Sequence, residues 1–261
     1  MTKQEKEMHS LLTLTNLALA AAASFGLKQA LVPRLRAASQ VDVAAEDEAF
    51  QQRLQCWDRT SQNGDSVIAT DYMPYISYHN MDNKIESCVF NGIWILYGEE
   101  VYNSGNPLAH NFWAYGENYA TDMPSNFMNE ASSLRYSGHP QDMYKDSINM
   151  YFNEYFMGDE EFAYQNSPVL NYDNRAQSII VTGDQWWTIY ESANYGGYKA
   201  CLAPGQDNMP AFYSTMGSLH SLANDISSVA IGCYAKDKFY PDALNVTSRS
   251  AHGAGGFFGG H

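Results

Sequence analysis

The chain has 261 residues with 15 Lys and Arg against 29 Asp and Glu, so its formal net charge is −14. A protein that binds nucleic acid needs a basic stripe along the phosphate backbone, and this acidic balance argues against such a partner. Aromatic residues make up 14% and charged residues only 17% of the chain, which is typical of a packed β-rich protein and excludes a disordered acidic chain.

The N-terminal segment has the pattern of a secretory signal. An apolar run over residues 11–23 follows two lysines and ends in three alanines, the small residues that precede a cleavage site. Two glutamates offset the lysines, so an ordinary N-terminal helix is the alternative, and the run is too short to span a bilayer. We expect residues 1–23 to be a signal peptide or N-terminal helix and residues 24–49 a linker or pro-segment. The predicted location is secreted or in a secretory granule, or cytoplasmic if the segment is not a signal.

A six-residue pattern, here called a hexad, occurs four times in the body of the chain. Asn is second, Ile or Ala fourth and Ser sixth in every copy. The final serines are 46, 45 and 50 residues apart, and a regular period of this kind indicates a repeated structural unit. The hexads cover residues 82–87, 128–133, 173–178 and 223–228.

A second pattern lies upstream of each hexad. The pattern is an aromatic residue, a second residue five positions later, and a Gly two positions after that. It starts at Trp57, Tyr151 and Tyr190. In the unit that starts at Tyr97, the Gly comes one position later. Gly adopts positive φ without a Cβ clash, as a tightly folded β-hairpin requires. Residues shared by the first and third units differ from those shared by the second and fourth. The units therefore follow the order A-B-A-B.

Together these two patterns resemble those of the βγ-crystallin family, in which each unit is a Greek key and two keys form one domain. The resemblance covers about residues 50–235 and is clearest in the fourth unit. It implies an all-β fold of two βγ-crystallin-like domains, residues 50–137 and 138–235, each a sandwich of two four-stranded antiparallel sheets. The abundance of Tyr, Asn and Gly independently favours many short strands joined by turns.

The hexads are rich in the oxygen ligands that calcium prefers, whereas the His and Cys residues lack zinc-ligand spacing. In calcium-binding members of the family, each site combines an acidic or amide side chain of one hexad with a hydroxyl at position five of the other. Carbonyl groups of position three and of the hairpin complete the site. The metal-site residues that the resemblance implies are Asp82, Asn83, Lys84, Glu86, Asn129, Glu130, Ser132, Asp173, Asn174, Arg175, Gln177, Asn224, Asp225 and Ser227.

Each hexad lacks one residue of the family pattern. The A hexads have no hydroxyl at position five, and the B hexads have no carboxylate at position one. The crossing pairs Asp82 with Ser132 and Asp173 with Ser227 then predict one better site per domain. The reciprocal pairs, Glu86 with Asn129 and Gln177 with Asn224, predict weak or absent sites. The alternative is that all four hexads are purely structural, as in lens-type members.

The four cysteines fall two in each half of the body. In an oxidising compartment they would form two disulfides, and the sequence leaves three pairings open. The economical pairing joins Cys56 with Cys88 and Cys201 with Cys233. Four buried thiols are the alternative.

The chain ends in a segment that we expect to be a flexible Gly-rich tail, residues 236–261. Asn245 begins a glycosylation sequon, which has meaning only in a secretory pathway. No catalytic motif occurs, and the histidines occupy different positions in the repeats, so we expect no enzyme.

The predicted function is that of a non-enzymatic, calcium-binding structural protein of a matrix, granule or extracellular layer. Its expected partners are calcium and either further copies of itself or matrix components, because neutralising the acidic charge removes self-repulsion. The alternatives are a secreted effector, such as a protease inhibitor, toxin or pore-complex subunit, and a sugar-binding module.

Overall fold

The computed structural model describes residues 50–243 and 255–259, which lie in one compact unit of the chain, residues 45–261. The described part is built of β-strands with one short α-helix, α1 (Met216–Leu219), so the predicted all-β fold class is confirmed. No helix in the described ranges is long and apolar enough to cross a membrane. The strands are β1 (Arg53–Arg59), β2 (Asn63–Ala69), β3 (Ser87–Tyr97), β4 (Asn111–Asp122), β5 (Ser133–Ser137), β6 (Ser147–Tyr151), β7 (Glu160–Ala163), β8 (Ser178–Thr182), β9 (Trp187–Ser192), β10 (Gly196–Leu202), β11 (Ala211–Tyr213), β12 (Ser228–Ile231), β13 (Lys238–Phe239) and β14 (Gly255–Gly259).

In the N-terminal half, strands β3 and β4 each run through both sheets of the sandwich. The first part of β3 pairs with β1, which pairs with β2, and its second part pairs with β5, while β4 follows β3 along its whole length. The register shifts between Phe90 and Gly92, and Gly92 has a φ of 109°. Fully buried Gln52 braces this bend, because its Oε1 accepts a hydrogen bond from the Ile93 N–H at 2.8 Å. The two predicted four-stranded sheets are therefore joined here.

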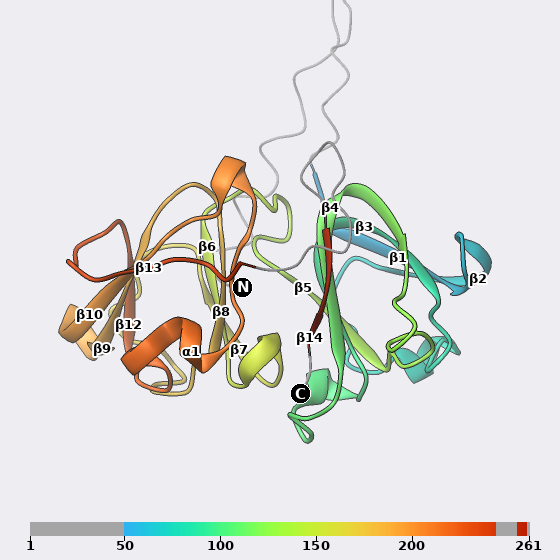
Figure 1. The fold of residues 1–261 in the computed structure, drawn as a ribbon, viewed down its shortest axis with the longest axis horizontal. Coiled ribbons are helices and arrows are strands. Elements are labelled where there is room, and N and C mark those ends of the chain that lie inside the picture. The colour runs from blue at the N-terminus through green and yellow to red at the C-terminus, as the bar shows by residue number, and fades with distance from the viewer. Residues whose placement is uncertain (1–49, 244–254, 260–261) are drawn as a thin grey trace, which may run out of the picture. The chain divides into compact units, whose positions relative to one another are not determined.

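The C-terminal half separates the corresponding strands into two sheets. One has the order β11-β8-β6-β7 and the other the order β12-β9-β10-β13. Its first sheet takes β11 from the fourth repeat unit, just as the β1–β2 sheet takes the end of β4 from the second unit. This exchange of strands between consecutive units is the Greek-key arrangement that the repeats predicted (Figure 1).

Each half has its own hydrophobic core. The first includes Leu54, Phe90 and Trp94, all at most 1% exposed, and the second includes Trp187 and Leu219, both fully buried. A third cluster contains residues of both halves, so the two sandwiches bury apolar surface against each other.

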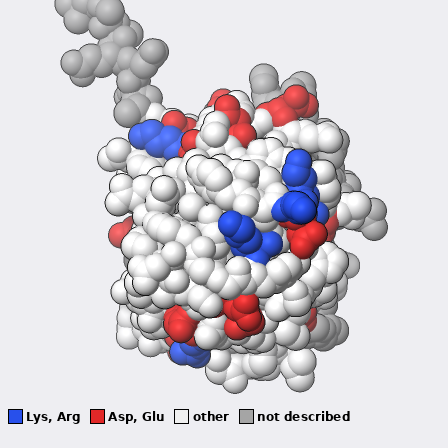
Figure 2. All heavy atoms as spheres, turned by 90° about the vertical axis from the view of Figure 1, so that its left-hand side faces the viewer, with Lys and Arg blue, Asp and Glu red and all other residues white. Residues whose placement is uncertain are grey.

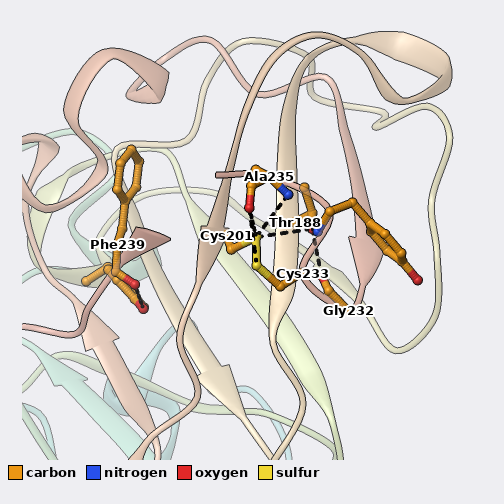
Figure 3. Close-up of a disulfide and its surroundings, with 8 residues drawn as sticks. Thr188, Cys201, Gly232, Cys233, Ala235 and Phe239 are labelled. Atoms are coloured by element: carbon orange, nitrogen blue, oxygen red, sulfur yellow. Dashed lines mark hydrogen bonds between the residues drawn. A yellow bond between two sulfur atoms is a disulfide. The ribbon is translucent and has the colours of Figure 1, made fainter. Parts of the chain in front are cut away.

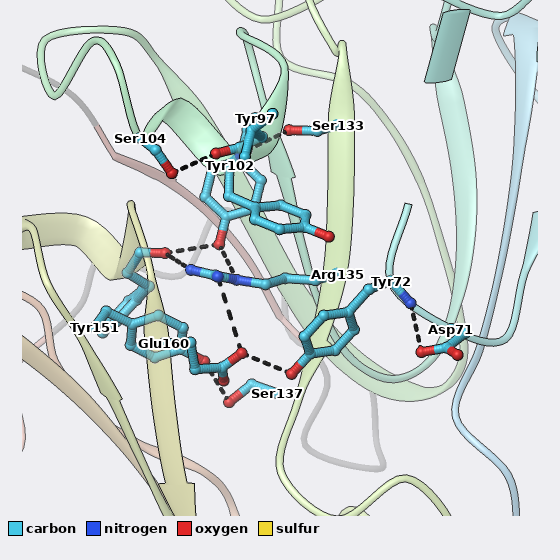
Figure 4. Close-up of polar contacts among 12 residues, drawn as sticks. Asp71, Tyr72, Tyr97, Tyr102, Ser104, Ser133, Arg135, Ser137, Tyr151 and Glu160 are labelled. Carbon is cyan, nitrogen blue, oxygen red and sulfur yellow. Dashed lines mark hydrogen bonds and ion pairs between the residues drawn. The ribbon is translucent and has the colours of Figure 1, made fainter. Parts of the chain in front are cut away.

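A buried arginine lies in this shared interface. Arg135, on β5, is 1% exposed; its Nε donates to the Tyr97 hydroxyl at 2.9 Å and its Nη2 to the Phe156 carbonyl at 3.0 Å. Its guanidinium lies 3.9 Å from the buried carboxylate of Glu160, on β7 of the other half. Figure 4 shows this group between the rings of Tyr97 and Tyr151. Because an uncompensated buried charge is costly, this ion pair ties the two halves together.

Two disulfides join the cysteines in the economical pairing. Cys56 and Cys88 are cross-strand partners on β1 and β3, and Cys201 pairs with Cys233. Around the second bond, Thr188 donates to the Gly232 carbonyl at 2.6 Å, and the N–H of Ala235 points to the Cys201 sulfur at 3.4 Å (Figure 3). This disulfide holds the segment after β12 against the sheet.

Two strands lie within the range predicted as a flexible tail. Strand β13 pairs in parallel with β10, through Lys238 and Phe239, and buries Phe239 in the second core. Strand β14 pairs with β4. The second sandwich therefore continues past residue 235, in contrast to the expected boundary. The predicted signal peptide, the linker and the Asn245 sequon lie outside the described residues.

Candidate functional site

The Asn at position two of every hexad occupies the left-handed region of φ. The four φ values are 53°, 63°, 59° and 58° for Asn83, Asn129, Asn174 and Asn224. Asn tolerates this conformation better than most residues because its short polar side chain bonds locally. This requirement explains why Asn occurs at position two in all four copies.

Within each half, the two hexads lie against each other through reciprocal backbone bonds. In the first half, the Asn83 N–H donates to the Ala131 carbonyl at 3.0 Å, and the Asn129 N–H donates to the Ile85 carbonyl at 2.9 Å. The second half has the same exchange, with distances of 3.1 Å and 2.8 Å. Position four, which supplies each carbonyl, is buried in the core in every copy. The two hexads of each half are therefore in direct contact, while their predicted cooperation in binding calcium stays a prediction.

The serines at position five reach across to the partner hexad. The Ser132 hydroxyl donates to Asn83 Oδ1 at 3.4 Å, and the Ser227 hydroxyl lies 3.2 Å from Asn174 Oδ1. Ser227 also donates to the Glu191 carbonyl, in the fourth hairpin, at 2.7 Å. A side-chain amide oxygen, a hydroxyl and a hairpin carbonyl thus converge in the second half.

The predicted carboxylates at position one lie beside these pairs but do not bond to the serines. Asp82 Oδ2 accepts from the Asn83 amide at 3.3 Å, while Asp82 Oδ1 is buried with no hydrogen-bond partner in the described part of the chain. Asp173 is exposed. The amide at position two therefore makes the crossing contact, and its strict repetition in the sequence is the signal that points to it.

The reciprocal pairs differ from the serine pairs. In the first half, the Asn129 amide donates to Glu86 Oε1 at 3.0 Å, so the carboxylate already has a partner. In the second half, Gln177 and Asn224 line a cleft of about 300 Å³ whose lining also includes Asn174, Arg175 and Asp159. The Arg175 guanidinium lies 4.3 Å from the centre of the Phe152 ring. A fixed positive charge at this place opposes cation binding.

The other predicted site residues lie at the edges of the loops. Lys84 Nζ donates to the Asn80 carbonyl at 2.9 Å, and Glu130 Oε2 lies 3.2 Å from His110 Nδ1. Asn83 and Glu130 line a second cleft of about 300 Å³ together with Gly98. Asp225 donates its N–H to the Leu222 carbonyl at 3.1 Å.

On the face that Figure 2 shows, Lys and Arg lie scattered among Asp and Glu and form no basic tract. Among residues 50–243 and 255–259, no group of three or more His, Cys, Asp or Glu is placed to hold a metal. A cation at the hexads would therefore depend on amide, hydroxyl and carbonyl oxygens together with single carboxylates.

Comparison with known proteins places the fold. Geodin, a βγ-crystallin from Geodia cydonium, is 18% identical over 69% of this chain and 99% of its own, with a TM-score of 0.55. A βγ-crystallin from Ciona intestinalis is 22% identical over 33% of this chain and 98% of its own, with a TM-score of 0.29. An archaeal βγ-crystallin is 30% identical over 33% of this chain and 96% of its own, also with a TM-score of 0.29.

A family model described as peptidase inhibitor family I36 matches residues 132–202. This stretch runs from the second hexad into β10 and so includes parts of both halves. A search of curated proteins finds no match.

Proposed function

The chain has the βγ-crystallin fold, and on this premise we propose that it is a non-enzymatic structural protein that binds one calcium ion in each half. The observation that carries the proposal is the convergence of Ser227 Oγ, Asn174 Oδ1 and the Glu191 carbonyl at the paired hexads. Oxygens of these three kinds are hard ligands of the type that calcium takes in flexible loops.

The residues in the first half fit the same ion. Ser132 and Asn83 form the equivalent crossing pair, and no donor among the described residues bonds to the buried Oδ1 of Asp82. A buried carboxylate oxygen without a donor is costly, and a cation would remove that cost. We assign Asp82, Asn83 and Ser132 to this site, and Asn174, Ser227 and the Glu191 carbonyl to the site in the second half, with Asp173 at its edge.

The reciprocal positions support only weak binding. Glu86 is already bonded to Asn129, and the Arg175 charge lies beside Gln177 and Asn224. Calcium bound only to the folded chain stabilises it in proportion to the logarithm of its concentration over its dissociation constant. The role of the ion in this proposal is therefore to stiffen the loops that join the strands.

The two disulfides are typical of an oxidising compartment, and we propose that the protein is secreted or stored in a granule. In such a place, calcium would also reduce the repulsion between acidic chains, whose formal charge is −14. Self-association or contact with other matrix components follows from this charge neutralisation.

Thermal unfolding of the full chain in calcium and in a chelator tests this function. The melting temperature is expected to rise with calcium in the unmodified protein and in Ser66→Ala, a control on the exposed part of β2. In the double variant Ser132→Ala/Ser227→Ala the rise should largely disappear. A melting temperature that calcium leaves unchanged would contradict the proposal.

The match to peptidase inhibitor family I36 supports a second candidate function, inhibition of a peptidase. Residues 132–202 would carry it, and the buried interface around Arg135 would hold them in one rigid arrangement. Residual activity of a panel of serine and metallopeptidases, measured with nanomolar protein, distinguishes the two functions. Inhibition that persists in the double serine variant and, for the serine peptidases, also in the chelator would favour the inhibitor.

A further inference from the structure

A cleft outside the hexads lies in the loop that follows β2. Residues 68–79 curl around a space of about 290 Å³, lined by three tyrosines, Tyr72, Tyr75 and Tyr78, and by Asp71. Among the described residues that line it there is no Lys or Arg, and His79 is the one basic residue. Lys84, which contacts the loop at the Asn80 carbonyl, does not line the cleft.

The cleft depends on an insertion in the N-terminal half. Met73 and Ser167 are equivalent, since each exchanges backbone bonds with the strand that follows the second hexad of its half, β5 or β12. Ten residues separate Met73 from the hexad Asn83, but only seven separate Ser167 from Asn174. The longer loop forms the 3-10 helix η1 (Ile76–His79), and no such helix occurs between β7 and β8 in the described part of the other half.

The aromatic rings of the cleft are one exposed ring, Tyr78, one half-buried ring, Tyr75, and a third ring, Tyr72, that is held in place. The ring centres of Tyr75 and Tyr78 are 5.4 Å apart, and Tyr78 is 80% exposed. Tyr72 is held, because its hydroxyl donates to Glu160 at 2.6 Å and its ring packs edge-on against Tyr136. Figure 4 shows the Tyr72 hydroxyl directed at Glu160, with Asp71 at the backbone end of the same residue.

Two carboxylates lie at the rim of the cleft or contact its loop. Asp71 Oδ1 accepts from the Tyr72 N–H at 2.7 Å, which fixes the carboxylate at the rim, and Glu100 reaches the same loop through the Ser77 hydroxyl at 3.4 Å. Burial, and then the charge of Asp71, raise the pKa of Tyr136. The Asp71 carboxylate therefore interacts electrostatically with Tyr136, which packs against Tyr72. The net negative charge of the chain adds to the attraction for cations.

We propose that this cleft binds an organic cation, an alkylated ammonium group held against the rings of Tyr75 and Tyr78 and neutralised by Asp71. Aromatic faces combined with a carboxylate recognise such groups through cation–π attraction, which strengthens when water is excluded. The group belongs either to a free quaternary ammonium compound or to a lysine side chain of a partner, and both present the same chemistry. This site does not involve the hexads, so it stands apart from calcium binding.

Titration of the full chain in excess calcium, followed by the NMR signals of the tyrosine rings, tests the proposal. Choline is the probe, and 3,3-dimethylbutan-1-ol is its uncharged counterpart of the same shape. Choline should bind with a dissociation constant on the order of millimolar, as an exposed aromatic site allows, and the neutral alcohol about tenfold more weakly. N-acetyl-lysine methylamide distinguishes the two sources of the cation, since tighter binding than choline indicates a lysine side chain and weaker binding a quaternary ammonium compound.

Variants locate the site. Tyr78→Ala and Asp71→Asn should each weaken choline binding about tenfold, while Tyr78→Phe should retain it because the ring face is kept. Tyr172→Ala, at the exposed tyrosine of the shorter loop in the other half, should leave it unchanged. Equal binding of choline and the neutral alcohol, binding of glucose in place of choline, or equal effects of Tyr78→Ala and Tyr172→Ala would overturn the proposal.

Discussion

The two halves form the corresponding bend between their sheets in different ways. In the first, β3 passes from one sheet to the other at Gly92, where any Cβ would overlap the Gln52 side chain. In the second, Gly183 stands against Asp146, the counterpart of Gln52, and the chain turns before β9 begins. Asp146 Oδ1 accepts from the N–H groups of Asp184 and Gln185, at 3.1 Å and 3.2 Å, so a carboxylate caps a turn where Gln52 braces a continuous strand.

The spacing of the repeats records this difference. Ten residues separate Ser87 from Tyr97, but twelve separate Ser178 from Tyr190. The two extra residues supply the turn. The paired hexads nevertheless keep the same reciprocal backbone bonds in both halves. The loops that we assign to calcium are therefore better preserved than the strands that join the sheets.

Removing the buried positive charge at the interface of the two halves should have the largest effect on stability. Arg135→Ala leaves Glu160 buried without its partner and should lower the free energy of unfolding by about 3–5 kcal/mol, measured by denaturant titration. The double variant Arg135→Met/Glu160→Met should recover much of this loss, because neither charge remains. A loss below about 1 kcal/mol in Arg135→Ala, similar to that of a surface change such as Arg59→Ala, would show that the interface does not depend on the ion pair.

The disulfides allow the halves to be compared at equal loop length. Both bonds join residues 32 apart, so the chain-entropy model predicts about 3–4 kcal/mol for each. The variants Cys56→Ala/Cys88→Ala and Cys201→Ala/Cys233→Ala should therefore lose similar stability in denaturant titrations. The second pair should in addition release the segment that carries β13, seen as faster amide exchange at Phe239. Unchanged exchange there would contradict the anchoring role of that bond.

Restoring the missing hydroxyls sharpens the comparison between strong and weak hexads. Glu86→Ser should create a crossing pair with Asn129 and add a weak calcium site to the first half. Gln177→Ser should add less to the second half, because the Arg175 charge remains. We expect tightening of about tenfold or less in each weak site, measured by calorimetric titration. Equal gains in both halves would argue against the proposed effect of Arg175.

The smallest expected effect is on stability at alkaline pH. Partial desolvation is the main cause that raises the pKa of Tyr102 in the first half and of Tyr164 in the second to about 12. Because these folded-state pKa values lie above the ordinary value of 10.0, their stabilising contribution is complete below pH 10 and is lost as the pH rises through about 12. In an alkaline titration followed by ultraviolet absorbance, these two tyrosines should therefore ionise at a higher pH than free tyrosine. Titration of both rings at the ordinary pH would contradict these raised pKa values.

Much of the fold follows from the sequence because it is written in repeats. The hexads and hairpin glycines predicted the Greek keys, and the position of two cysteines in each half predicted the pairing observed. At Gly158, with a φ of 77°, the predicted need for glycine in the hairpin is met. The hairpin that follows Tyr97 differs, because Asn103 adopts the left-handed conformation there and its side chain accepts from the Glu99 N–H.

Other features depend on contacts between distant segments, which a local pattern does not contain. In the sequence, nothing distinguishes Arg135 from a polar residue on an ordinary strand. It is buried because the second half packs over β5. The loop of Tyr78 is three residues longer than its counterpart, but the clustering of its rings depends on how η1 folds. For the hexads, the sequence identified the loops, whereas the left-handed backbone decided that Asn83 and Asn174, and not the preceding aspartates, face the serines.

Calorimetric counting of calcium ions tests the central proposal most directly. The unmodified chain should bind two ions, one per half, and either Ser132→Ala or Ser227→Ala should reduce the count of tight sites to one. No calcium-linked heat would contradict the proposal outright. Four equal sites would contradict the distinction between serine pairs and reciprocal pairs.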